Sequence, residues 1–246
     1  MIVDLQQANL EIIRVNYNAV IDRISAIAKS IGRNPLDIHL VVVTKTHSTD
    51  VIRAVIEAGA TQLGENYLEE AIPKILALQD AGEIEWHMIG HVQSRKARDV
   101  CEYFNYMHSL DSIKLGERIS RFAGELDRIF SVWLEFNVSG ELTKSGWGAQ
   151  NEDHWDNLLP DMERLLSLPN LEIKGLMTVP PYSPNPEDAR PFYRHLRRLQ
   201  EYLVNHFQLG GWRELSMGMS SDYEIAIQEG ATWVRIGQAI LGPRLV

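Results

Sequence analysis

Hydrophobic positions along the chain follow two alternating patterns. Short apolar or β-branched runs alternate with longer segments in which apolar residues recur every three to four positions, as in amphipathic helices. The runs are the strand candidates, at residues 38–44, 61–64, 85–90, 106–110, 131–138, 172–179, 214–219 and 232–237. The helical segments lie between them, at residues 51–58, 68–80, 94–103, 113–126, 153–168, 186–207 and 222–229. About eight parallel strands separated by helices close a barrel at this chain length, so we predict an α/β fold, a (β/α)8 TIM barrel.

An extra helix is predicted before the first strand. Its apolar face repeats at three- and four-residue steps, through Leu10, Ile13, Tyr17, Ile21, Ile24 and Ile27. Charged residues interrupt this segment, so it is not a signal peptide and we expect it to be retained. No apolar run is long enough to span a bilayer.

The whole chain is predicted to form one domain, residues 1–246. No linker is evident, and VIEAGATQLGEN (55–66) resembles AIQEGATWVRIG (226–237), which indicates a repeated βα unit rather than two domains. Hydrophobic residues make up 45% and charged residues 23%, as in ordinary globular proteins. The net charge of -9 gives no attraction to nucleic acid or anionic lipid. Because Cys101 is the only cysteine, no intramolecular disulfide can form, and we expect a cytoplasmic protein.

Lys45 is the first candidate for chemistry, because it follows the buried-type run VVV in VVVTKTHS (41–48). The ordinary interpretation is that the strand has ended and Lys45 points into water. In a barrel, however, residues at the carboxyl ends of the strands meet at one mouth. That set comprises Lys45, Glu65, Asn66, His87, His91, Asn137, Met177, Thr178, Ser220, Ser221, Arg235, Gly237 and Gln238. A lysine in such a partly desolvated pocket is a candidate for forming a Schiff base.

The last two strands offer features that bind anions. MGMSSD (217–222) precedes a helix, and RIGQAILG (235–242) adds small residues whose backbone amides form a phosphate cradle at a helix start. Each part has a plainer alternative, since Gly237 and Gly242 also suit turns and Arg235 also suits a structural ion pair. An amine for an aldehyde and a cradle for a phosphate together point to pyridoxal 5'-phosphate (PLP).

Other chemistries have weaker support. His87 and His91 have the spacing of two metal ligands on a helix, but along a strand it separates them by roughly 13 Å, so we predict no metal site. No Ser-His-Asp arrangement can be argued from spacing. The irregular segments 139–150 and 180–186 each follow a strand and are expected at the mouth, although plain surface connections would look the same.

Several segments resemble those of a known family in collinear order from about residue 10 onward. They include VVVTKTHS (41–48), LGENYLEEAIPK (63–74), EWHMIGHVQSRK (85–96), GLMTVPP (175–181), LSMGMSSDYEIAI (215–227) and GATWVRIGQAILGPR (230–244). The chain is similar to the pyridoxal phosphate homeostasis proteins, the YggS/PROSC family. The resemblance implies a fold-type III barrel, like the barrel of alanine racemase without its second domain.

The resemblance also implies roles for individual residues. Lys45 would carry PLP covalently as a Schiff base, and Arg235 would approach the pyridine nitrogen. Asn66, His87, Met88 and Met177 would surround the ring. Ser220, Gly237 and Gln238 would hold the phosphate. Gln238 stands where threonine is more usual and His91 where proline is frequent, so the part played by the Gln238 side chain is open.

Two classes of function then compete. One is a PLP carrier without strong catalysis, which acts in PLP homeostasis and delivers PLP to apo-enzymes. The other is an amino-acid racemase-like enzyme, for which no second acid/base domain is visible after the last strand. A cofactor-free Schiff-base aldolase is a third alternative. We expect the carrier, as a monomer with a weak dimer as the alternative.

Overall fold

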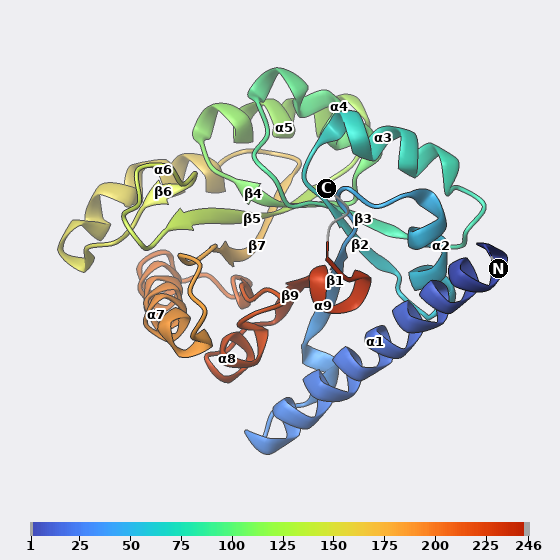
Figure 1. Cartoon of the computed structure of the whole chain (residues 1–246). Coiled ribbons are helices and arrows are strands. Elements are labelled where there is room, and N and C mark those ends of the chain that lie inside the picture. Colours follow the sequence, from blue (N-terminus) through green and yellow to red (C-terminus); the bar gives the residue numbers. More distant parts are fainter. Residues whose placement is uncertain (1, 244–246) are drawn as a thin grey trace.

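The centre of the molecule is a closed barrel of parallel strands, as predicted. The computed structural model describes residues 2–243, with side chains from residue 11 onward. The strand order is β4-β3-β2-β1-β9-β8-β7-β5, and a β4–β5 pairing closes the ring (Figure 1). The barrel strands are β1 (His39–Val43), β2 (Gln62–Glu65), β3 (Glu85–Met88), β4 (Tyr106–Leu110), β5 (Phe130–Asn137), β7 (Leu171–Met177), β8 (Glu214–Ser216) and β9 (Trp233–Ile236).

Helices surround the barrel on its outside (Figure 1). They are α1 (Ile2–Ser30), α2 (Thr49–Glu57), α3 (Leu68–Ala77), α4 (Ala97–Tyr103), α5 (Ile113–Glu125), α6 (Leu159–Leu166), α7 (Arg190–Phe207), α8 (Tyr223–Gln228) and α9 (Gln238–Leu241). Single 3-10 segments occur at η1 (Pro35–Asp37), η2 (Ser94–Lys96), η3 (Glu152–Leu158) and η4 (Pro186–Ala189). Three of the predicted helices, at 94–103, 153–168 and 186–207, therefore begin with a tighter 3-10 turn. In the described residues, no helix is both long and apolar enough to cross a bilayer.

The sequence patterns missed the shortest elements. β6 (Trp147–Gly148) pairs in parallel with the end of β5, outside the barrel, and its two residues carry no readable period. Gly146 precedes it with φ of 100°, and an added Cβ would lie 2.5 Å from the carbonyl oxygen of Glu135. Only glycine fits so close an approach of two backbones. α9 was likewise not predicted, although it forms part of the site described below.

The N-terminal helix packs against helices from both the beginning and the end of the barrel sequence. The buried side chains of α1 include Ile13, Val20, Ile24 and Ile27. α1 contacts α2 on one side and α8 and α9 on the other (Figure 1). The prediction was wrong for Ile21, which is 38% exposed while Val20 is buried, because the buried stripe drifts by one position around the helix. Leu10 lies outside the residues whose side chains are described.

The two similar segments form equivalent units. Gly59 and Gly230 end α2 and α8 with φ of 109° and 105°, in the left-handed region that a glycine adopts without strain. Ala60 N then donates to Val55 O at 3.0 Å, and Ala231 N donates to Ala226 O at 2.9 Å. The repeated βα unit predicted from 55–66 and 226–237 is confirmed.

Two apolar layers hold the barrel. A large cluster fills the space between the strands and the helices. A smaller one fills the barrel interior, with Val41, Trp133, Met177 and Trp233 at its centre. Because successive strand residues point to opposite sides, each strand contributes to both layers. The interior is thus packed at this level.

Candidate functional site

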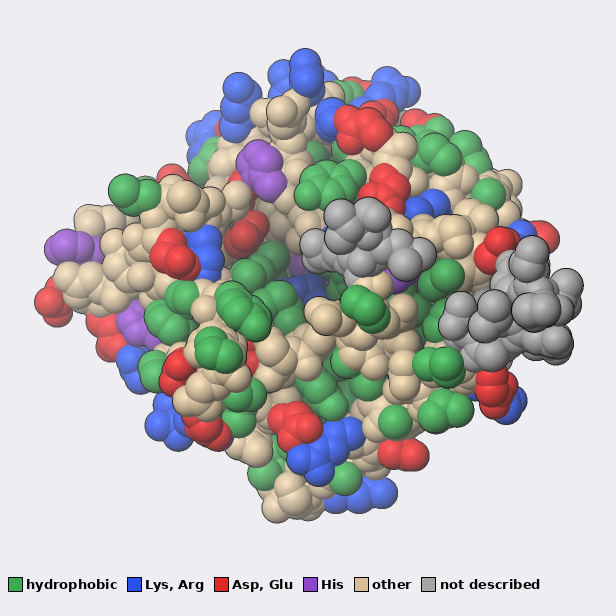
Figure 2. All heavy atoms as spheres, viewed as in Figure 1, with side chains coloured by type: hydrophobic (Ala, Val, Ile, Leu, Met, Phe, Trp, Pro, Cys, Tyr) green, Lys and Arg blue, Asp and Glu red, His purple; other side chains and the backbone are tan. Residues whose placement is uncertain are grey.

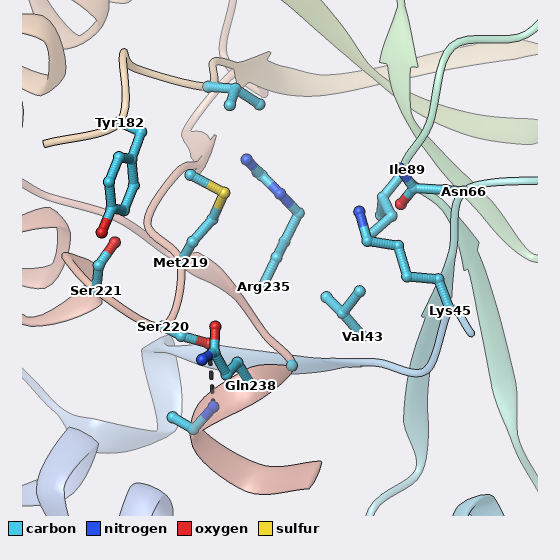
Figure 3. Close-up of a pocket in the computed structure, with 13 residues that line it drawn as sticks. Val43, Lys45, Asn66, Ile89, Tyr182, Met219, Ser220, Ser221, Arg235 and Gln238 are labelled. Atoms are coloured by element: carbon cyan, nitrogen blue, oxygen red, sulfur yellow. Dashed lines mark hydrogen bonds between the residues drawn. The ribbon is translucent and has the colours of Figure 1, made fainter. Parts of the chain in front are cut away.

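A cavity of about 810 Å³ opens at the carboxyl ends of the strands. The face in Figure 2 is hollowed at its centre, where hydrophobic and basic side chains are visible. The cavity is lined by Val43, Lys45, Asn66, Ile89, Val179, Tyr182, Met219, Ser220, Ser221, Arg235, Gly237, Gln238 and Ala239. Figure 3 shows Lys45 and Asn66 along one side, Tyr182, Ser220 and Ser221 along the other, and Arg235 between them.

Lys45 lies two residues beyond the end of β1. The strand alternates inward at Val41 and Val43, and Lys45 continues that alternation into the cavity. Thr46 follows with φ of 67°, a left-handed conformation that is uncommon for a β-branched residue. Such a conformation persists only where neighbouring contacts hold it.

Those contacts come from a buried ionic cluster behind Lys45, which we call the Lys74 cluster: Thr44, Glu65, Glu70 and Lys74. Lys74 Nζ donates to Thr44 O at 2.9 Å, to Glu65 Oε1 at 2.8 Å and to Glu70 Oε1 at 2.5 Å. Thr44 Oγ1 donates to Glu65 Oε1 at 2.7 Å, and Thr46 N donates to Glu70 Oε1. The cluster therefore forms hydrogen bonds to the residues on both sides of Lys45, Thr44 and Thr46.

Glu65 belongs to this cluster rather than to the cavity. Burial raises the pKa of Glu65, against the opposing hydrogen bond and charge of Lys74. Asn66, the next residue, lines the cavity, because the chain turns out of β2 between the two. The predicted mouth set is therefore divided here, with Asn66 at the site and Glu65 behind it.

Arg235 on β9 forms the floor of the cavity. It is 4% exposed, and burial lowers its pKa, while Tyr193, Glu135 and Asp222 act to raise it. Its Nη1 donates to Ser216 Oγ at 2.5 Å, and its Nη2 donates to Thr178 O at 3.0 Å. Val41 on β1 is the register partner of Arg235 on β9, so the first and last strands are neighbours, and Lys45, after the end of β1, lines the same cavity as Arg235.

The far side of the cavity is built from backbone and small side chains. Ala239 N donates to Ser220 Oγ at 3.2 Å, which joins the loop after β8 to the start of α9 (Figure 3). A Cβ on Gly237 would lie 3.0 Å from the carbonyl oxygen of Val43, so glycine permits α9 to start close to β1. The first amides of a helix have no acceptor within that helix and are available to an anion.

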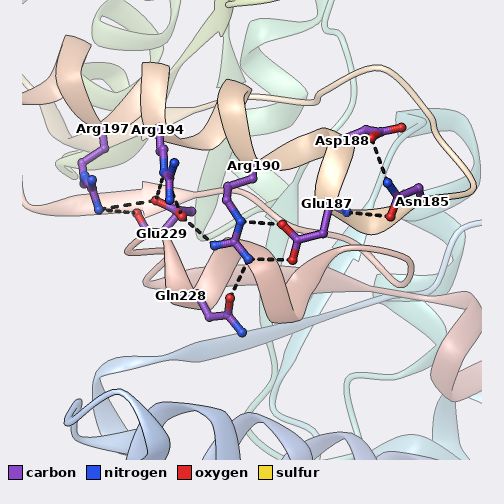
Figure 4. Close-up of polar contacts among 8 residues, drawn as sticks. All are labelled: Asn185, Glu187, Asp188, Arg190, Arg194, Arg197, Gln228 and Glu229. Atoms are coloured by element: carbon purple, nitrogen blue, oxygen red, sulfur yellow. Dashed lines mark hydrogen bonds and ion pairs between the residues drawn. The ribbon is translucent and has the colours of Figure 1, made fainter.

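Two contacts fix the loop that carries Ser220 and Ser221. Met219 N donates to Asp222 Oδ1 at 2.7 Å at its base. At the other end of α8, Glu229 accepts from Arg190 Nη1 at 2.6 Å and from Arg194 Nε at 3.1 Å, and Arg197 lies 3.7 Å away (Figure 4). These arginines come from α7, so an ionic clamp ties the C-terminal end of α8 to α7.

Relatives place the chain in a family. The family defined by the alanine racemase N-terminal domain matches residues 15–244. A pyridoxal phosphate homeostasis protein of Pseudomonas aeruginosa is 40% identical over 230 residues, which cover 93% of this chain and 94% of that protein. One of Escherichia coli is 36% identical over 232 residues, 93% of this chain and 95% of that protein. This chain belongs to the pyridoxal phosphate homeostasis protein family.

Solved structures agree with this membership of the pyridoxal phosphate homeostasis family. PipY of Synechococcus elongatus, solved with PLP bound, has a TM-score of 0.77 and 34% identity, and the match covers 91% of this chain and 100% of PipY. Alanine racemase of Clostridium difficile has a TM-score of 0.69 at 13% identity, covering 92% of this chain and 56% of the racemase. The latter likeness confirms the alanine racemase type of barrel.

Six of the nine residues that the family resemblance assigns to the cofactor line one cavity. They are Lys45, Asn66, Ser220, Arg235, Gly237 and Gln238. The structure places the other three elsewhere. His87 and Met177 lie in the barrel interior, and Met88 points outward into the layer beneath the helices. Ile89 lines the cavity in that stretch, because alternation along β3 puts His87 and Ile89 on the inner side and Met88 on the outer side.

Other members of the predicted mouth set are also spread out. Thr178 Oγ1 donates to Phe136 O at 2.8 Å, away from the cavity, while its carbonyl holds Arg235. His91 is exposed, and its Nδ1 lies 2.6 Å from Asp111 Oδ2. Asn137 Oδ1 accepts from Gly140 N at 2.9 Å and so caps the turn after β5. These residues shape the surroundings of the site.

Sequence reasoning missed several lining residues. Val43 could have been found by counting back two residues from Lys45 along the strand. Tyr182 is 86% exposed and lies in the irregular segment 180–186, which was expected at the mouth without a named residue. Glu135, which is not among the lining residues but shares the inward face of β5 with Trp133, was also not considered. Burial beside Asp111 raises its pKa to about 7, although Arg235 and His91 oppose this shift.

Proposed function

We propose that this chain binds PLP in the 810 Å³ cavity, holds it as a Schiff base on Lys45, and serves intracellular PLP homeostasis and delivery without strong catalysis of its own. Bound PLP supplies an aldehyde carbon that accepts an amine. The observation that carries this proposal is that one cavity combines an amine just after β1, a buried guanidinium on β9 and backbone amides at the start of α9.

The residues fit the three parts of PLP. Lys45 matches the aldehyde, and the Ser220 hydroxyl with the amides of Gly237 and Gln238 matches a phosphate dianion. Asn66, Ile89 and Val43 provide partly apolar walls for an aromatic ring. The relatives named as PLP homeostasis proteins and the PLP-bound PipY support the same ligand.

Arg235 favours a carrier over an enzyme. A guanidinium facing the pyridine nitrogen opposes protonation of that nitrogen, and an unprotonated ring is a poor electron sink for carbanion chemistry. Arg235 is held by two hydrogen bonds at the cavity floor and stays cationic. The racemase-like alternative would need proton exchange on two faces of a substrate, and it is the second candidate because of the shared barrel.

The proposal extends to the working state of the protein. We infer one PLP-binding domain over residues 1–246, acting as a cytoplasmic monomer that hands PLP to apo-enzymes. The observation behind a monomer is that one chain supplies all three features used by the proposal, the amine, the guanidinium and the backbone amides. Sedimentation at increasing protein concentration, with and without PLP, measures the oligomeric state directly. A dimer that dissociates when a cavity residue is replaced would contradict the monomer.

Absorbance and mass spectrometry test the attachment. The protein with PLP should be yellow, and borohydride should bleach the band and fix the cofactor mass on the peptide that contains Lys45. Lys45→Ala should remain folded and colourless, and Lys114→Ala, on the exposed face of α5, should behave as the wild type. Cofactor mass on another lysine, or a wild type that takes up no PLP, would refute the site.

Transfer and racemisation assays separate the two functions. In the presence of a trap for free PLP, the PLP-loaded protein should restore the activity of an apo-enzyme faster than the same total amount of free PLP does. No α-proton exchange should occur with L- or D-amino acids in D2O. Exchange at rates typical of enzymes would favour the racemase-like alternative.

A further inference from the structure

A row of buried polar side chains runs through the barrel interior beneath the cavity. His87 on β3 and His108 on β4 are fully buried, and His87 Nδ1 lies 2.9 Å from His108 Nε2. Their rings pack within an aromatic cage, in which Tyr106 stacks on His87 at 4.7 Å and Trp133 stacks on His108 at 4.0 Å. The cage leaves each imidazole only its two in-plane nitrogens for polar contact.

The row continues upward to the cavity. His108 Nδ1 lies 2.7 Å from Ser216 Oγ. Ser216 Oγ in turn accepts from Arg235 Nη1 at 2.5 Å. Ser216 and His108 thus connect the interior histidines to the guanidinium that lines the cavity.

The row also continues downward to the opposite end of the barrel. His87 Nε2 lies 2.5 Å from Gln62 Oε1, and Gln62 Nε2 donates to Glu85 Oε2. The other oxygen, Glu85 Oε1, accepts from Tyr106 OH at 3.0 Å. One unbroken chain of hydrogen bonds therefore joins Arg235 at the cavity to Glu85 at the amino-terminal end of the strands.

The end groups determine the direction of every bond. A guanidinium can only donate, and a carboxylate can only accept. Burial lowers the pKa of His87 to about 3 and the pKa of His108 well below its ordinary value, so each imidazole is neutral and has one donor and one acceptor. Gln62 Nε2 donates to Glu85, so Gln62 Oε1 accepts from His87 Nε2. His87 Nδ1 then accepts from His108 Nε2, and His108 Nδ1 accepts from the Ser216 hydroxyl, whose oxygen accepts from Arg235.

The reverse direction is excluded at the lower end. A proton on His87 Nδ1 would leave His87 Nε2 facing Gln62 Oε1, two acceptors at 2.5 Å. Turning the Gln62 amide over would relieve that contact only by pointing its oxygen at the Glu85 carboxylate. Both arrangements bury facing acceptors, which is costly.

We propose that Ser216, His108, His87 and Gln62 act as positioning residues that fix Arg235 in the cavity, with both imidazoles as neutral Nε2–H tautomers and Glu85 as the fixed acceptor at the far end. This inference rests on the proposed function only in its claim that Arg235 is positioned for PLP. The chain of bonds itself is a property of the barrel.

The row of side chains positions Arg235 and does not conduct protons. Shifting each proton one link toward Glu85 would leave a neutral guanidine and a carboxylic acid at the two ends. The ordinary pKa of arginine lies far above that of a carboxyl, so this state is strongly disfavoured. The direction of the chain is therefore locked, and Arg235 presents the same face to the cavity at all times.

Nitrogen NMR of the histidines tests the tautomers without PLP. Long-range proton–nitrogen spectra of 15N-histidine protein at pH 7 should show two neutral Nε2–H imidazoles that do not titrate down to pH 5. Protonation of either buried ring, or an Nδ1–H tautomer, overturns the proposal. Because PLP is absent, this result is independent of whether Lys45 binds the cofactor.

Two substitutions then connect the row to the cavity. Ser216→Ala cuts the link beside Arg235, and Gln62→Met cuts the link nearest Glu85. We expect both variants to shift the pH titration of the PLP absorption band. In Gln62→Met, His87 should also move away from the pure Nε2–H form. PLP should dissociate roughly tenfold more readily from Ser216→Ala, the effect of one lost charge-assisted bond. Glu172→Gln is the matched control, since Glu172 lies at the same barrel end but bonds to Ser131 and Lys174.

The outcomes are distinct. If Gln62→Met leaves both imidazoles and the absorption titration as in the wild type, the row does not position Arg235 and the proposal fails. If the tautomers are as stated but no PLP attaches to Lys45, the proposed function fails instead. Circular dichroism of each variant confirms that the barrel is retained, and the wild-type spectrum decides the tautomers if a variant does not fold.

Discussion

The ammonium nitrogen of Lys74 lies 2.9 Å from the carbonyl oxygen of Thr44, the residue that precedes Lys45. Lys74 is 7% exposed, and its remaining donors are taken by Glu65 and Glu70. Two lysines therefore lie near the cavity. Lys74 is enclosed by the acceptors of its cluster, whereas Lys45 lines the cavity and is the candidate for Schiff-base formation.

Replacing Lys74 should destabilise the protein. Lys74→Met leaves the buried carboxylate of Glu65 without its cation, which typically costs about 3 to 5 kcal/mol of unfolding free energy. The loop from Thr44 to Thr46 should loosen, and Lys45 should take up PLP more slowly. Urea unfolding and the rate of appearance of the yellow band measure these effects. Lys114→Met, on the surface, should change neither, and an unaltered Lys74→Met would show that the cluster does not hold Lys45.

Ser220→Ala should weaken PLP retention. The hydroxyl lines the cavity beside the start of α9, and loss of a charge-assisted hydrogen bond to a phosphate costs something like 1 to 3 kcal/mol. Equilibrium dialysis of the loaded protein gives the change in affinity. Ser167→Ala, whose hydroxyl bonds only to the backbone of α6, should retain PLP as the wild type does. Equal retention by both variants would remove Ser220 from the site.

Glu135 should make stability depend on pH near neutrality. Its pKa is raised to about 7 in the folded state by burial, so the folded form favours the protonated acid. Below about pH 4 the carboxyl is protonated in both the folded and the unfolded state, so it does not affect the free energy of unfolding. As the pH rises from about 4.5 to 7, the unfolded state ionises first and the free energy of unfolding falls, by up to about 3 kcal/mol above pH 7. Glu135→Gln should thus stabilise the chain at pH 8 and leave it unchanged at pH 4.

Chemical unfolding of Glu135→Gln at several pH values checks this sign. Glu163→Gln, on the exposed side of α6, provides the baseline. A stabilisation that is the same at pH 4 and pH 8 would mean that Glu135 ionises normally in the folded protein.

Glu229→Gln should loosen the ionic clamp between α7 and α8. Although burial opposes ionisation, the hydrogen bonds from Arg190 and Arg194 lower the pKa of Glu229. Its contribution is present above the ordinary carboxyl pKa and is lost as the pH falls through the lowered folded value. We expect a loss of roughly 1 to 3 kcal/mol at pH 7 and a smaller loss at pH 3, measured by urea unfolding. Glu201→Gln, an exposed partner of Arg197, should cost less than about 0.5 kcal/mol, and an equally small loss for Glu229→Gln would deny the clamp.

The barrel could be predicted because strand and helix periods are local. Each of its eight strands contains enough apolar or β-branched residues to be recognised within its own segment. β6 and α9 could not, since two and four residues are too few to show a period. Their positions depend on contacts with β5 and with the loop after β8.

The candidate site was predictable in part for the same reason. Lys45 and Arg235 follow from counting strand ends in a closed barrel, and the cavity contains both. The row through His87 was not predictable, because Ser216 and His108 are 108 positions apart and their contact depends on how the barrel closes. His87 was expected beside the cofactor ring by resemblance, whereas its inward position one layer lower follows from the alternation along β3.

The pairing of β1 with β9 has a consequence for biosynthesis. The Lys45 side of the cavity leaves the ribosome first, and the wall that carries Arg235 follows 190 residues later. A partly made chain has an amine without a floor or an anion cradle beside it. If the cavity binds PLP as proposed, a nascent chain that stops before Arg235 would not capture the cofactor.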